Sequence, residues 1–382
     1  MGIAENDITA LKVLHVQKVA GIGGSEQHLL TLLPALRAAG VDVRMLVAAT
    51  GQYERFTEPL RARGVPTRVV PAGPDLNPLL VTALVREIRA FRPDLVHTHL
   101  VHADLHGQAA AGLAGVGRVS SVHGTPGFYR REPYRTAARL AGRFTRVTIA
   151  ISDHVRTFLE GVQLTPAQRI QVVPYGIDAA AWRMPEPDRL RTRSALGLQD
   201  ADVAVGIAAR LIAGKGHAFL LEALGAAVRR SPRLRLLVAG DGPLRARLEQ
   251  QAATVGNGTV RFLGHVSDMR AFMNACDVLA FPTEPALGEG FGLAALEAMA
   301  SGRPVVATRV GSLPEVVTAR ETGLLVDPGA TDELATALVL LAEDGRLRHD
   351  LGERAAERAQ VVFPVEAMVR RTLAVYDRAM RG

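Results

Sequence analysis

Short apolar runs alternate with amphipathic stretches along almost the whole chain. Each run is brief enough for a buried strand, and the stretches between them carry apolar side chains at helical spacing. The first set of runs lies at residues 11–16, 41–47, 65–70, 94–99, 119–122, 148–152 and 170–174. A second set lies at residues 203–208, 234–239, 260–263, 277–281, 305–308 and 322–326. Strand–helix alternation is typical of parallel sheets covered by helices, so the pattern predicts an α/β protein with two such sheets.

An irregular passage separates the two sets of runs. It extends from residue 174 to residue 198 and places Pro185 and Pro187 among charged residues. Prolines in a polar stretch are typical of a boundary between domains. The length of 382 residues also suits two domains of roughly 100–200 residues each. We therefore predict an N-terminal domain of residues 1–178 and a C-terminal domain of residues 179–364.

The most informative loop follows a short apolar run and precedes a helical stretch. Gly288, Gly290 and Gly292 lie where this helix is expected to begin. Glycines there let backbone N–H groups approach a ligand closely, and the helix dipole favours an anion. Glu289 and Glu297 flank the loop, and carboxylates are good acceptors for sugar hydroxyls. The stretch predicts a sugar-nucleotide site; the alternative is a helix start with one surface acid and one buried structural glutamate.

A second glycine-rich turn follows the first apolar run of the chain. It contains Gly21 and Gly23, with Gly24 next to them. Glu26 stands where a dinucleotide-binding fingerprint requires its third glycine. The turn therefore predicts a phosphate-binding strand–loop–helix unit but not a nicotinamide enzyme.

Two cations follow the first apolar run of the second half. Arg210 and Lys215 lie on the same loop, where they would neutralise a diphosphate. The sequence around Lys215 lacks the upstream glycine and the following serine or threonine of a nucleotide-binding P-loop. A P-loop NTPase is therefore excluded.

Two groups of residues superficially suggest a metal site. His97, His99 and His102 are close in sequence, but no cysteine or carboxylate completes a ligand set. Asp200 and Asp202 form an acidic pair of the kind that binds metal in some enzymes, but the pair precedes a strand instead of following one. We expect the pair to be solvent-facing, and we predict no metal.

Histidines also mark the ends of two predicted strands in the first half. His99 ends one strand and His123 follows another. Ligands gather at the carboxyl ends of parallel strands, so we expect His99 to face the cleft. For His123, a structural role and a functional role are equally open at this point.

A basic stripe lies on the helix expected between residues 133 and 148. Arg135, Arg139, Arg143 and Arg146 recur at helical spacing, and Arg130 and Arg131 precede them. A basic face beside an apolar one suits an anionic membrane surface or an acidic acceptor. The alternative is a face that is only solvated.

Composition narrows the classes of partner. The net charge of +7 favours an anionic partner. Aromatic residues make up 4% of the chain and form no stacking motif, which argues against nucleic acid. One cysteine allows no disulfide within the chain, no signal peptide is recognisable, and no run of about 18 uncharged apolar residues is present. We expect a cytoplasmic protein that can touch the inner face of a membrane.

Taken together, these motifs resemble the retaining glycosyltransferases of family 4, whose GT-B fold has two Rossmann-like domains facing a cleft. The most specific match is the segment from Glu289 to Glu297, which corresponds to the E-x7-E element of that family. Supporting matches lie at residues 23–26, 94–99, 123–124, 210–216, 240–243 and 311–315. Ser312 stands where a second glycine is frequent. We also predict that the helix of residues 365–382 packs back on the N-terminal domain.

The resemblance implies roles for the donor-side residues. Arg210 and Lys215 would hold the donor diphosphate, Glu297 the ribose, and Glu289 the transferred sugar. His123 would lie beside that sugar and help to stabilise the transition state. Backbone groups would complete the donor site at Gly23, Gly24, His265, Val266, Gly290, Phe291, Gly292 and Leu293.

On the acceptor side, we predict roles for Glu26, His99, Arg135 and Arg139. The resemblance implies transfer from a UDP- or GDP-sugar to a glycan, a lipid-linked acceptor or a small molecule. It implies no metal and no other cofactor. Two alternatives stay open: a nucleotide-sugar epimerase of the same fold, and a non-catalytic subunit that binds nucleotide sugars.

Overall fold

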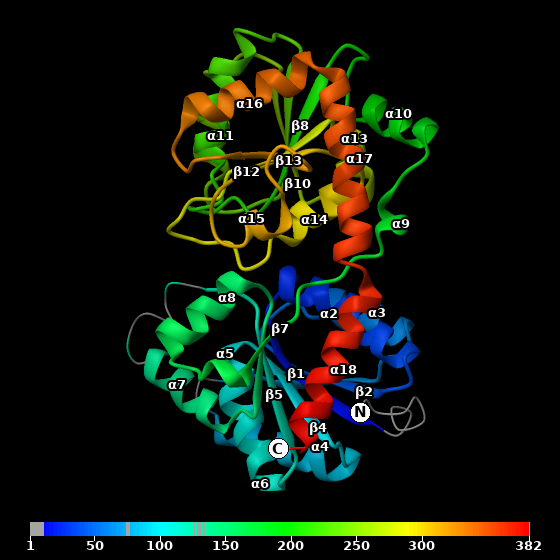
Figure 1. Ribbon diagram of the computed structural model, residues 1–382, viewed down its shortest axis with the longest axis vertical. Coiled ribbons are helices and arrows are strands. Elements are labelled where there is room, and N and C mark those ends of the chain that lie inside the picture. The colour runs from blue at the N-terminus through cyan, green and yellow to red at the C-terminus, as the bar shows by residue number, and fades with distance from the viewer. Residues whose placement is uncertain (1–10, 74–76, 126, 128–131, 133, 382) are drawn as a thin grey trace. The chain divides into compact units, whose positions relative to one another are not determined.

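The computed structural model describes residues 11–381 apart from 74–76, 126, 128–131 and 133 (Figure 1). The chain forms two compact units. Unit 1 comprises residues 1–176 and 365–382, and unit 2 comprises residues 177–364. The sequence-based boundary was placed after residue 178. Each unit is described separately below.

Unit 1 contains a parallel sheet of seven strands in the order β3-β2-β1-β4-β5-β6-β7. The strands are β1 (Lys12–Val19), β2 (Asp42–Ala49), β3 (Thr67–Pro71), β4 (Leu95–His99), β5 (Gly117–Val122), β6 (Val147–Ala150) and β7 (Ile170–Val172). The central strands are buried along almost their whole length, because helices cover both faces of the sheet. Strand order reverses between β1 and β4, and in open sheets such a switch point opens a crevice at the strands' carboxyl ends.

The helices of unit 1 supply two apolar layers. They are α2 (Gly24–Ala38), α3 (Glu54–Ala62), α4 (Pro78–Phe91), α5 (Leu100–Ala103), α6 (Ala109–Ala114), α7 (Tyr134–Phe144), α8 (Asp153–Phe158) and α18 (Val365–Arg381), with π-helical turns at Asp104–Gln108 and Leu159–Gln163 and a 3-10 turn at Ala167–Arg169. The terminal helix α18, red in Figure 1, contacts α2, β4, β5 and β6. Its Tyr376 is fully buried in unit 1. The end of the chain therefore belongs to the core of unit 1.

Unit 2 contains a parallel sheet of six strands in the order β10-β9-β8-β11-β12-β13. The strands are β8 (Val203–Ala208), β9 (Leu234–Ala239), β10 (Val260–Gly264), β11 (Val278–Phe281), β12 (Val305–Thr308) and β13 (Gly323–Val326). The helices are α9 (Ala179–Trp182), α10 (Glu186–Ala195), α11 (His217–Val228), α12 (Arg245–Ala252), α13 (Met269–Ala275), α14 (Leu293–Ala300), α15 (Leu313–Val316), α16 (Thr331–Glu343) and α17 (Gly345–Val362). Here the order reverses between β8 and β11. The predicted α/β architecture with two parallel sheets is confirmed.

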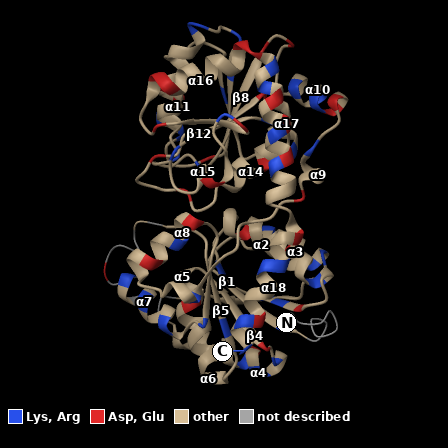
Figure 2. Cartoon of the chain, viewed as in Figure 1, with Lys and Arg blue, Asp and Glu red and all other residues tan. Residues whose placement is uncertain are grey.

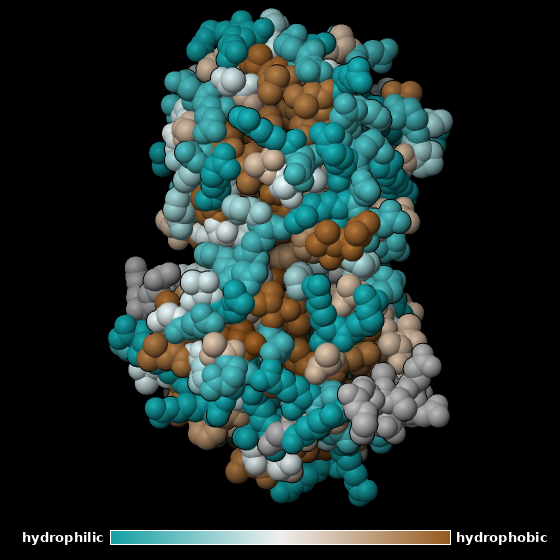
Figure 3. Space-filling view, viewed as in Figure 1, coloured by the Kyte–Doolittle hydropathy of each residue, from teal (hydrophilic) through white to brown (hydrophobic). Residues whose placement is uncertain are grey.

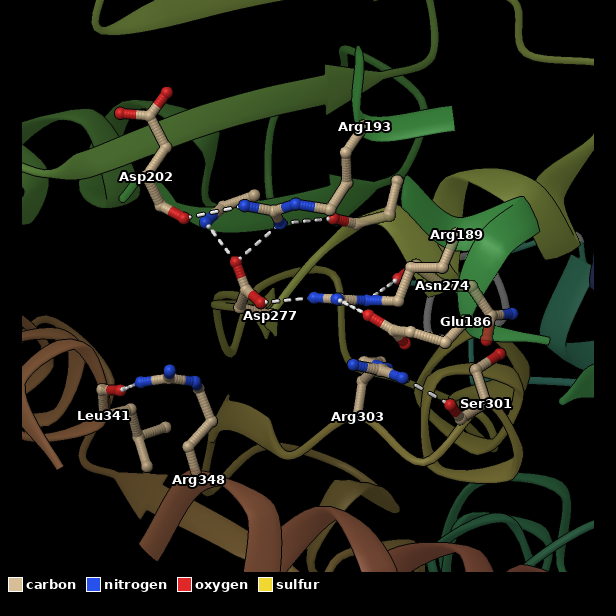
Figure 4. Close-up of polar contacts among 12 residues, drawn as sticks. Glu186, Arg189, Arg193, Asp202, Asn274, Asp277, Ser301, Arg303, Leu341 and Arg348 are labelled. Carbon is tan, nitrogen blue, oxygen red and sulfur yellow. Dashed lines mark hydrogen bonds and ion pairs between the residues drawn. The ribbon is translucent and has the colours of Figure 1, made fainter. Parts of the chain in front are cut away.

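A buried ion-pair network fixes α10 against the sheet of unit 2 (Figure 4). Asp277 accepts from Arg189 Nη2 at 2.7 Å and from Arg193 Nη1 at 2.8 Å. The same carboxylate accepts from the backbone N of Ala204 at 2.8 Å. The three charged side chains are between 7% and 13% exposed. Asp277 thus supplies the counter-charge of Arg193, and it shares Arg189 with Glu186, which lies 2.8 Å from Arg189 Nη1.

Asp202 belongs to the same region and corrects one expectation. It is buried, its carboxylate accepts from the backbone N of Gln199 at 2.8 Å, and it forms an ion pair with Arg235 at 3.0 Å. Asp202 is therefore a structural residue and not the solvent-facing acid that the sequence suggested. The arginine on the neighbouring strand β9 supplies the counter-charge that makes burial favourable.

We predict that Asp277→Ala lowers the free energy of unfolding of unit 2 by about 3–5 kcal/mol, because removal of one partner leaves buried charge uncompensated. Chemical denaturation followed by circular dichroism measures this loss. Asp188→Ala is the matched control, since Asp188 pairs with Arg191 on the exposed side of the same helix α10. That change should cost less than about 1 kcal/mol. Equal losses for the two variants would contradict the assignment.

Candidate functional site

The glycine-rich loop of unit 2 runs from the end of β11 to the start of α14. The loop after β12 is hydrogen-bonded to the middle of this glycine-rich loop. Ser312 donates to the Glu289 carbonyl from both its backbone N and its Oγ, each at 3.0 Å. Gly311 lies against the same residue with a φ of +59°, and a Cβ there would come within 2.5 Å of Glu289 N. Residue 311 must therefore be glycine, whereas serine at 312 adds a hydrogen bond.

Lys215 lies on the loop after β8, pressed against the same glycine-rich segment. Gly216 has a φ of +75°, and a Cβ there would lie 1.8 Å from the carbonyl oxygen of Pro282. This close approach brings Lys215 Nζ to 2.8 Å from Glu289 Oε2. The two side chains are 22% and 21% exposed. The structure thus joins two predicted site residues in one accessible ion pair.

The use of lysine at this position is unusual for the chain. The sequence contains three lysines, Lys12, Lys18 and Lys215, and the remaining 42 of its 45 basic residues are arginine. A compact ammonium differs from a planar guanidinium in size, hydration and number of donors. Lys215 is the one lysine in the sequence of unit 2.

Arg210 lies on the same loop as Lys215. Backbone hydrogen bonds fix the neighbouring Leu211: its N donates to the Asp241 carbonyl and its carbonyl accepts from Leu244 N, each at 3.0 Å. The Arg210 side chain is exposed, and it has no hydrogen bond or ion pair to any residue that the structure describes. The loop therefore carries one paired cation and one cation that is open to an anionic ligand.

Glu297 lies in α14, one helix turn beyond its start. Burial raises the pKa of its carboxyl group from 4.5 to about 8. Its carboxylate has no hydrogen-bond partner among the described residues. A carboxyl group in a desolvated position without a partner is a typical feature of a functional site.

The backbone groups predicted for the donor site lie on two loops of unit 2. Phe291 is buried and packs edge-on against Phe363, with ring centroids 5.7 Å apart. It anchors the segment in which Gly292 has a φ of +85° and precedes the first residue of α14, Leu293. His265 and Val266 follow β10, where His265 is exposed. Gly290 lies in the loop between Glu289 and Phe291.

In unit 1, Glu26 organises the glycine-rich turn after β1. It is buried; its Oε1 accepts from Gln17 Nε2 at 2.5 Å, and its Oε2 accepts from Gly23 N at 2.8 Å and Ser25 Oγ at 3.0 Å. The two carboxylate oxygens are thus used within the turn. Gly24 is the first residue of α2 and follows Gly23, whose N–H donates to this carboxylate. The sequence predicted that Glu26 would contact the acceptor. In the structure Glu26 instead stabilises the glycine-rich turn through its own hydrogen bonds.

His99 is completely buried, which corrects the expectation that it faces a cleft. Its Nε2 lies 2.9 Å from His15 Nδ1, and its Nδ1 lies 2.9 Å from His123 Nε2. The other ring nitrogen of His123 lies 2.7 Å from Tyr175 Oη. The structure therefore connects His99 and His123, which the sequence had only placed at the ends of two strands.

Sequence reasoning missed His15 and Tyr376 as parts of this cluster. The signal for His15 is its alignment with His97 on the neighbouring strand β4, which follows from the sheet register. Within the described part of the chain, one group of side chains could surround a metal ion, namely His15, His97 and His99, whose ligand atoms lie within 4.8 Å of one another. His102 is not part of it. The absence of a metal stays a prediction.

The arginine stripe on α7 is less uniform than the sequence suggested, although Figure 2 shows basic residues along this helix. The helix ends at Phe144, so Arg146 lies beyond α7, and its Nη1 donates to the Ala379 carbonyl of α18 at 2.9 Å. Arg135 forms an ion pair with Glu132 at 2.8 Å, and Arg139 donates to the Val162 carbonyl at 3.2 Å. Arg130 and Arg131 lie outside the described residues.

A cavity of about 440 Å³ opens beside α7. Arg139, Arg143 and Arg169 line it together with Leu140 and Leu164. Leu140 is 50% exposed and Leu164 is 62% exposed. The arrangement combines three cations with aliphatic surface, which the sequence pattern had not shown because Arg169 and Leu164 lie on other elements.

Comparison with protein families covers most of the chain. A model described as "Glycosyltransferase Family 4" matches residues 22–181, and one described as "Glycosyl transferases group 1" matches residues 202–344. A D-inositol 3-phosphate glycosyltransferase from Nocardioides is 31% identical over 94% of this chain and 85% of its own length. The chain belongs to glycosyltransferase family 4. It is therefore a glycosyltransferase that uses a nucleotide-sugar donor.

Two further proteins are similar to this family 4 glycosyltransferase. Anabaena HepE, solved in complex with UDP, superposes with a TM-score of 0.84 at 26% identity, covering 95% of this chain and 99% of HepE. A GDP-mannose-dependent monoacylated alpha-(1-6)-phosphatidylinositol monomannoside mannosyltransferase from Corynebacterium glutamicum is 32% identical over 64% of this chain and 65% of its own length. These likenesses confirm the predicted GT-B fold.

We predict that Glu297 makes this family 4 glycosyltransferase less stable at high pH. Between pH 4.5 and about 8, the folded chain keeps a proton on Glu297 that the unfolded chain has lost, so the free energy of unfolding falls as the pH rises through this window and levels off above it. Glu297→Gln should weaken this decline. Denaturation below, within and above the window measures it, with Glu357→Gln on the exposed face of α17 as control. Parallel pH profiles for wild type and Glu297→Gln would contradict the prediction.

Proposed function

We propose that this family 4 glycosyltransferase moves a sugar from a UDP- or GDP-sugar to an acceptor hydroxyl with retention of anomeric configuration and without a metal. The observation that carries the proposal is the Lys215–Glu289 ion pair at the switch point of unit 2. Crystal structures of the similar HepE in complex with UDP and with UDP-glucose support such a donor, as does the GDP-mannose dependence of the mannosyltransferase from C. glutamicum.

Lys215 and Arg210 bind the donor diphosphate in this proposal. Arg210 is open to an anion, whereas Lys215 must exchange its contact with Glu289 for a phosphate oxygen. A diphosphate carries more negative charge than one carboxylate, so it competes well for the ammonium. The exchange also releases Glu289, which then accepts hydrogen bonds from hydroxyls of the transferred sugar. Donor binding and sugar binding are thereby coupled through one ion pair.

Glu297 accepts hydrogen bonds from the ribose hydroxyls. Those hydroxyls are donors, so they favour the ionised carboxylate over the protonated group that burial imposes. The backbone N–H groups at Phe291, Gly292 and Leu293 approach the diphosphate at the start of α14, where the helix dipole adds a favourable charge. His265 and Val266 meet the base.

The chemical step needs no side-chain nucleophile. The bond between the anomeric carbon and the phosphate oxygen breaks, and the charge that grows on the leaving diphosphate is stabilised by Lys215 and Arg210. The acceptor oxygen attacks the same face of the sugar, and its proton passes to the departing phosphate oxygen. Fixed side-chain cations take the place that a metal ion holds in other transferases.

We propose an acceptor that combines hydroxyl groups with an anionic group, either a small polyol phosphate or the headgroup of an anionic lipid. Two similar proteins are named for inositol-containing acceptors, one a free phosphate and one a phosphatidylinositol mannoside. The basic cavity beside α7 matches such chemistry. None of the described helices is both long and apolar enough to cross a bilayer.

The test of the function is a donor panel assayed by release of nucleoside diphosphate. UDP- and GDP-sugars are offered in the presence of EDTA with polyol phosphates, inositol lipids and oligosaccharides as acceptors, and the anomeric configuration of the product is read by NMR. We expect one donor to be used in EDTA with the configuration kept. Activity that disappears in EDTA and returns with manganese would overturn the metal-independent proposal.

We predict that Lys215→Arg and Arg210→Ala each reduce kcat strongly. Arg210→Ala removes a fixed transition-state charge, a loss that typically costs about 2.7–4 kcal/mol. Lys215→Arg keeps the charge but not the compact shape, so the larger planar guanidinium cannot reproduce the contact that the ammonium makes with Glu289. The control is Lys18→Arg, at a lysine of unit 1 outside the proposed donor site. Steady-state kinetics with the true donor measure the effect, and a rate for Lys215→Arg near that of wild type would refute the role of the ammonium.

We also predict reversible binding to anionic vesicles through the cavity beside α7. Polar side chains (teal) cover most of the face in Figure 3, with apolar ones (brown) in separate patches. Arg139, Arg143 and Arg169 each add about 1 kcal/mol near an anionic surface. Sedimentation should show binding at low salt that is lost at high salt.

The triple change of Arg139, Arg143 and Arg169 to glutamine should remove this binding. A matched control changes Arg229, Arg309 and Arg346 of unit 2, which carry the same total charge on other surfaces. Equal sedimentation of the two triple variants would show that net charge alone is responsible. Failure of the wild type to sediment at low salt would favour a small, soluble acceptor.

A further inference from the structure

A continuous chain of hydrogen bonds crosses the core of unit 1. It joins seven side chains from the three strands β1, β4 and β5, the last helix and the segments that follow β5 and β7. In order they are Ser121, His97, Tyr376, His15, His99, His123 and Tyr175. The consecutive donor–acceptor distances are 2.7, 2.8, 3.2, 2.9, 2.9 and 2.7 Å. All of these are hydrogen-bond distances.

The imidazoles of this chain are uncharged. Burial lowers the pKa of His15 and His123 to about 3, and it lowers the pKa of His97 and His99 well below the usual value. A neutral imidazole has one N–H donor and one lone pair. A ring that accepts on one side must therefore donate on the other, and the direction of donation is passed from ring to ring.

Ser121 favours one direction of donation from its own end of the chain. Among the described residues its hydroxyl has one hydrogen-bond partner, His97 Nε2 at 2.7 Å. If Ser121 accepted from His97, its own O–H would be buried without an acceptor, at a cost of about 1–3 kcal/mol. If Ser121 donates, its proton is used and only a lone pair is left over. Donation from Ser121 is therefore favoured.

This direction fixes every proton up to His123. His97 Nδ1–H donates to Tyr376, whose hydroxyl donates to His15 Nε2. His15 Nδ1–H then donates to His99 Nε2, and His99 Nδ1–H donates to His123 Nε2. His123 Nδ1–H donates to Tyr175 Oη. Each of the four imidazoles consequently carries its proton on Nδ1.

We propose that Ser121, His97, Tyr376, His15 and His99 are positioning residues that hold His123 in its uncharged Nδ1–H tautomer beside the reacting sugar. The functional part of this inference rests on the proposed function together with the resemblance to family 4, which implies that His123 lies beside the transferred sugar. That sugar gains positive charge as the leaving group departs. A protonated His123 would repel it, whereas a neutral ring with both nitrogens occupied cannot take up the proton.

A metal ion explains the cluster less well. His15, His97 and His99 have ligand atoms within 4.8 Å of one another. However, hydrogen bonds to Ser121, Tyr376, His123 and within the trio already use all six ring nitrogens, and a metal would have to break several of them. No carboxylate or cysteine of the described residues joins the trio. The hydrogen-bonded chain accounts for every nitrogen without an added ion.

The tautomers are tested by NMR of protein labelled with ¹⁵N-histidine, in the absence of substrate. We expect His15, His97, His99 and His123 to show a protonated Nδ1 and an unprotonated Nε2 at neutral pH. A His123 that is protonated on Nε2, or on both nitrogens, would overturn the proposal, as would stoichiometric zinc in the purified protein. Because no donor is present, this result stands whether or not the proposed function is correct.

Two variants test the functional consequence. Tyr376→Phe and Ser121→Ala break the chain far from His123, so His123 should populate both tautomers. The kcat should fall by roughly ten- to a hundredfold, the range typical for losing a group that fixes an imidazole tautomer, while the donor KM stays unchanged. Ser121→Thr keeps the hydroxyl and should restore the single tautomer and the rate.

The matched control is Ser120→Ala, on the same strand. Ser120 is also buried, and its hydroxyl interacts with Asp104 instead of the chain. It should leave the His123 tautomer unchanged even if it lowers stability. Unaltered His123 signals and kcat in both Tyr376→Phe and Ser121→Ala would overturn the proposal.

Discussion

The ion pair between Lys215 and Glu289 is the interaction on which the account of this glycosyltransferase depends. It joins the loop after β8 to the loop after β11, the two loops at the switch point of the unit 2 sheet. It forms because Gly216 and Gly311 let backbone segments approach more closely than any side chain would permit. The pair holds a cation and a carboxylate side by side before any donor arrives, and in the proposed mechanism the donor diphosphate replaces the carboxylate as the partner of the ammonium.

The two units use their polar groups in opposite ways. In unit 2, Arg210 is exposed and Lys215 is held by a carboxylate that a diphosphate can replace. In unit 1, the carboxylate of Glu26 and the ring nitrogens of His123 are already used by neighbouring side chains. In unit 2, the cations Arg210 and Lys215 can therefore bind an anionic ligand. In unit 1, the hydrogen bonds of Glu26 hold a loop in its conformation, and those of His123 fix the position of its ring proton.

Much of the fold could be predicted because it depends on local pattern. Buried parallel strands appear as short apolar runs, and the switch from glycine-rich loop to helix at Gly292 is visible in the sequence. Glu289 and Glu297 were recognisable by their spacing within one continuous segment. The structure adds that Glu289 is paired with Lys215, a contact between two loops whose paired residues are 74 positions apart in the chain.

The remaining features depend on contacts between distant segments, which a pattern in one segment cannot reveal. His15 and Tyr376 are 361 residues apart and meet only through the register of β1 with β4 and the docking of α18. Arg146 leaves its stripe because a carbonyl of α18 accepts from it, and Asp202 is buried because Arg235 lies on the adjacent strand. In each case the side chain takes its role from a contact with a residue far away in the sequence, which the local sequence pattern does not show.

Calorimetric titration with UDP and GDP in EDTA, as a double-mutant cycle on Lys215 and Glu289, tests the central claim most directly. Because Glu289 competes with the diphosphate for Lys215, Glu289→Gln should bind the nucleotide more tightly than wild type. Lys215→Met should bind it weakly, and the double variant should match Lys215→Met. If Glu289→Gln weakens binding as much as Lys215→Met does, the two residues act as one structural unit and the proposed exchange of the ammonium from carboxylate to phosphate is wrong.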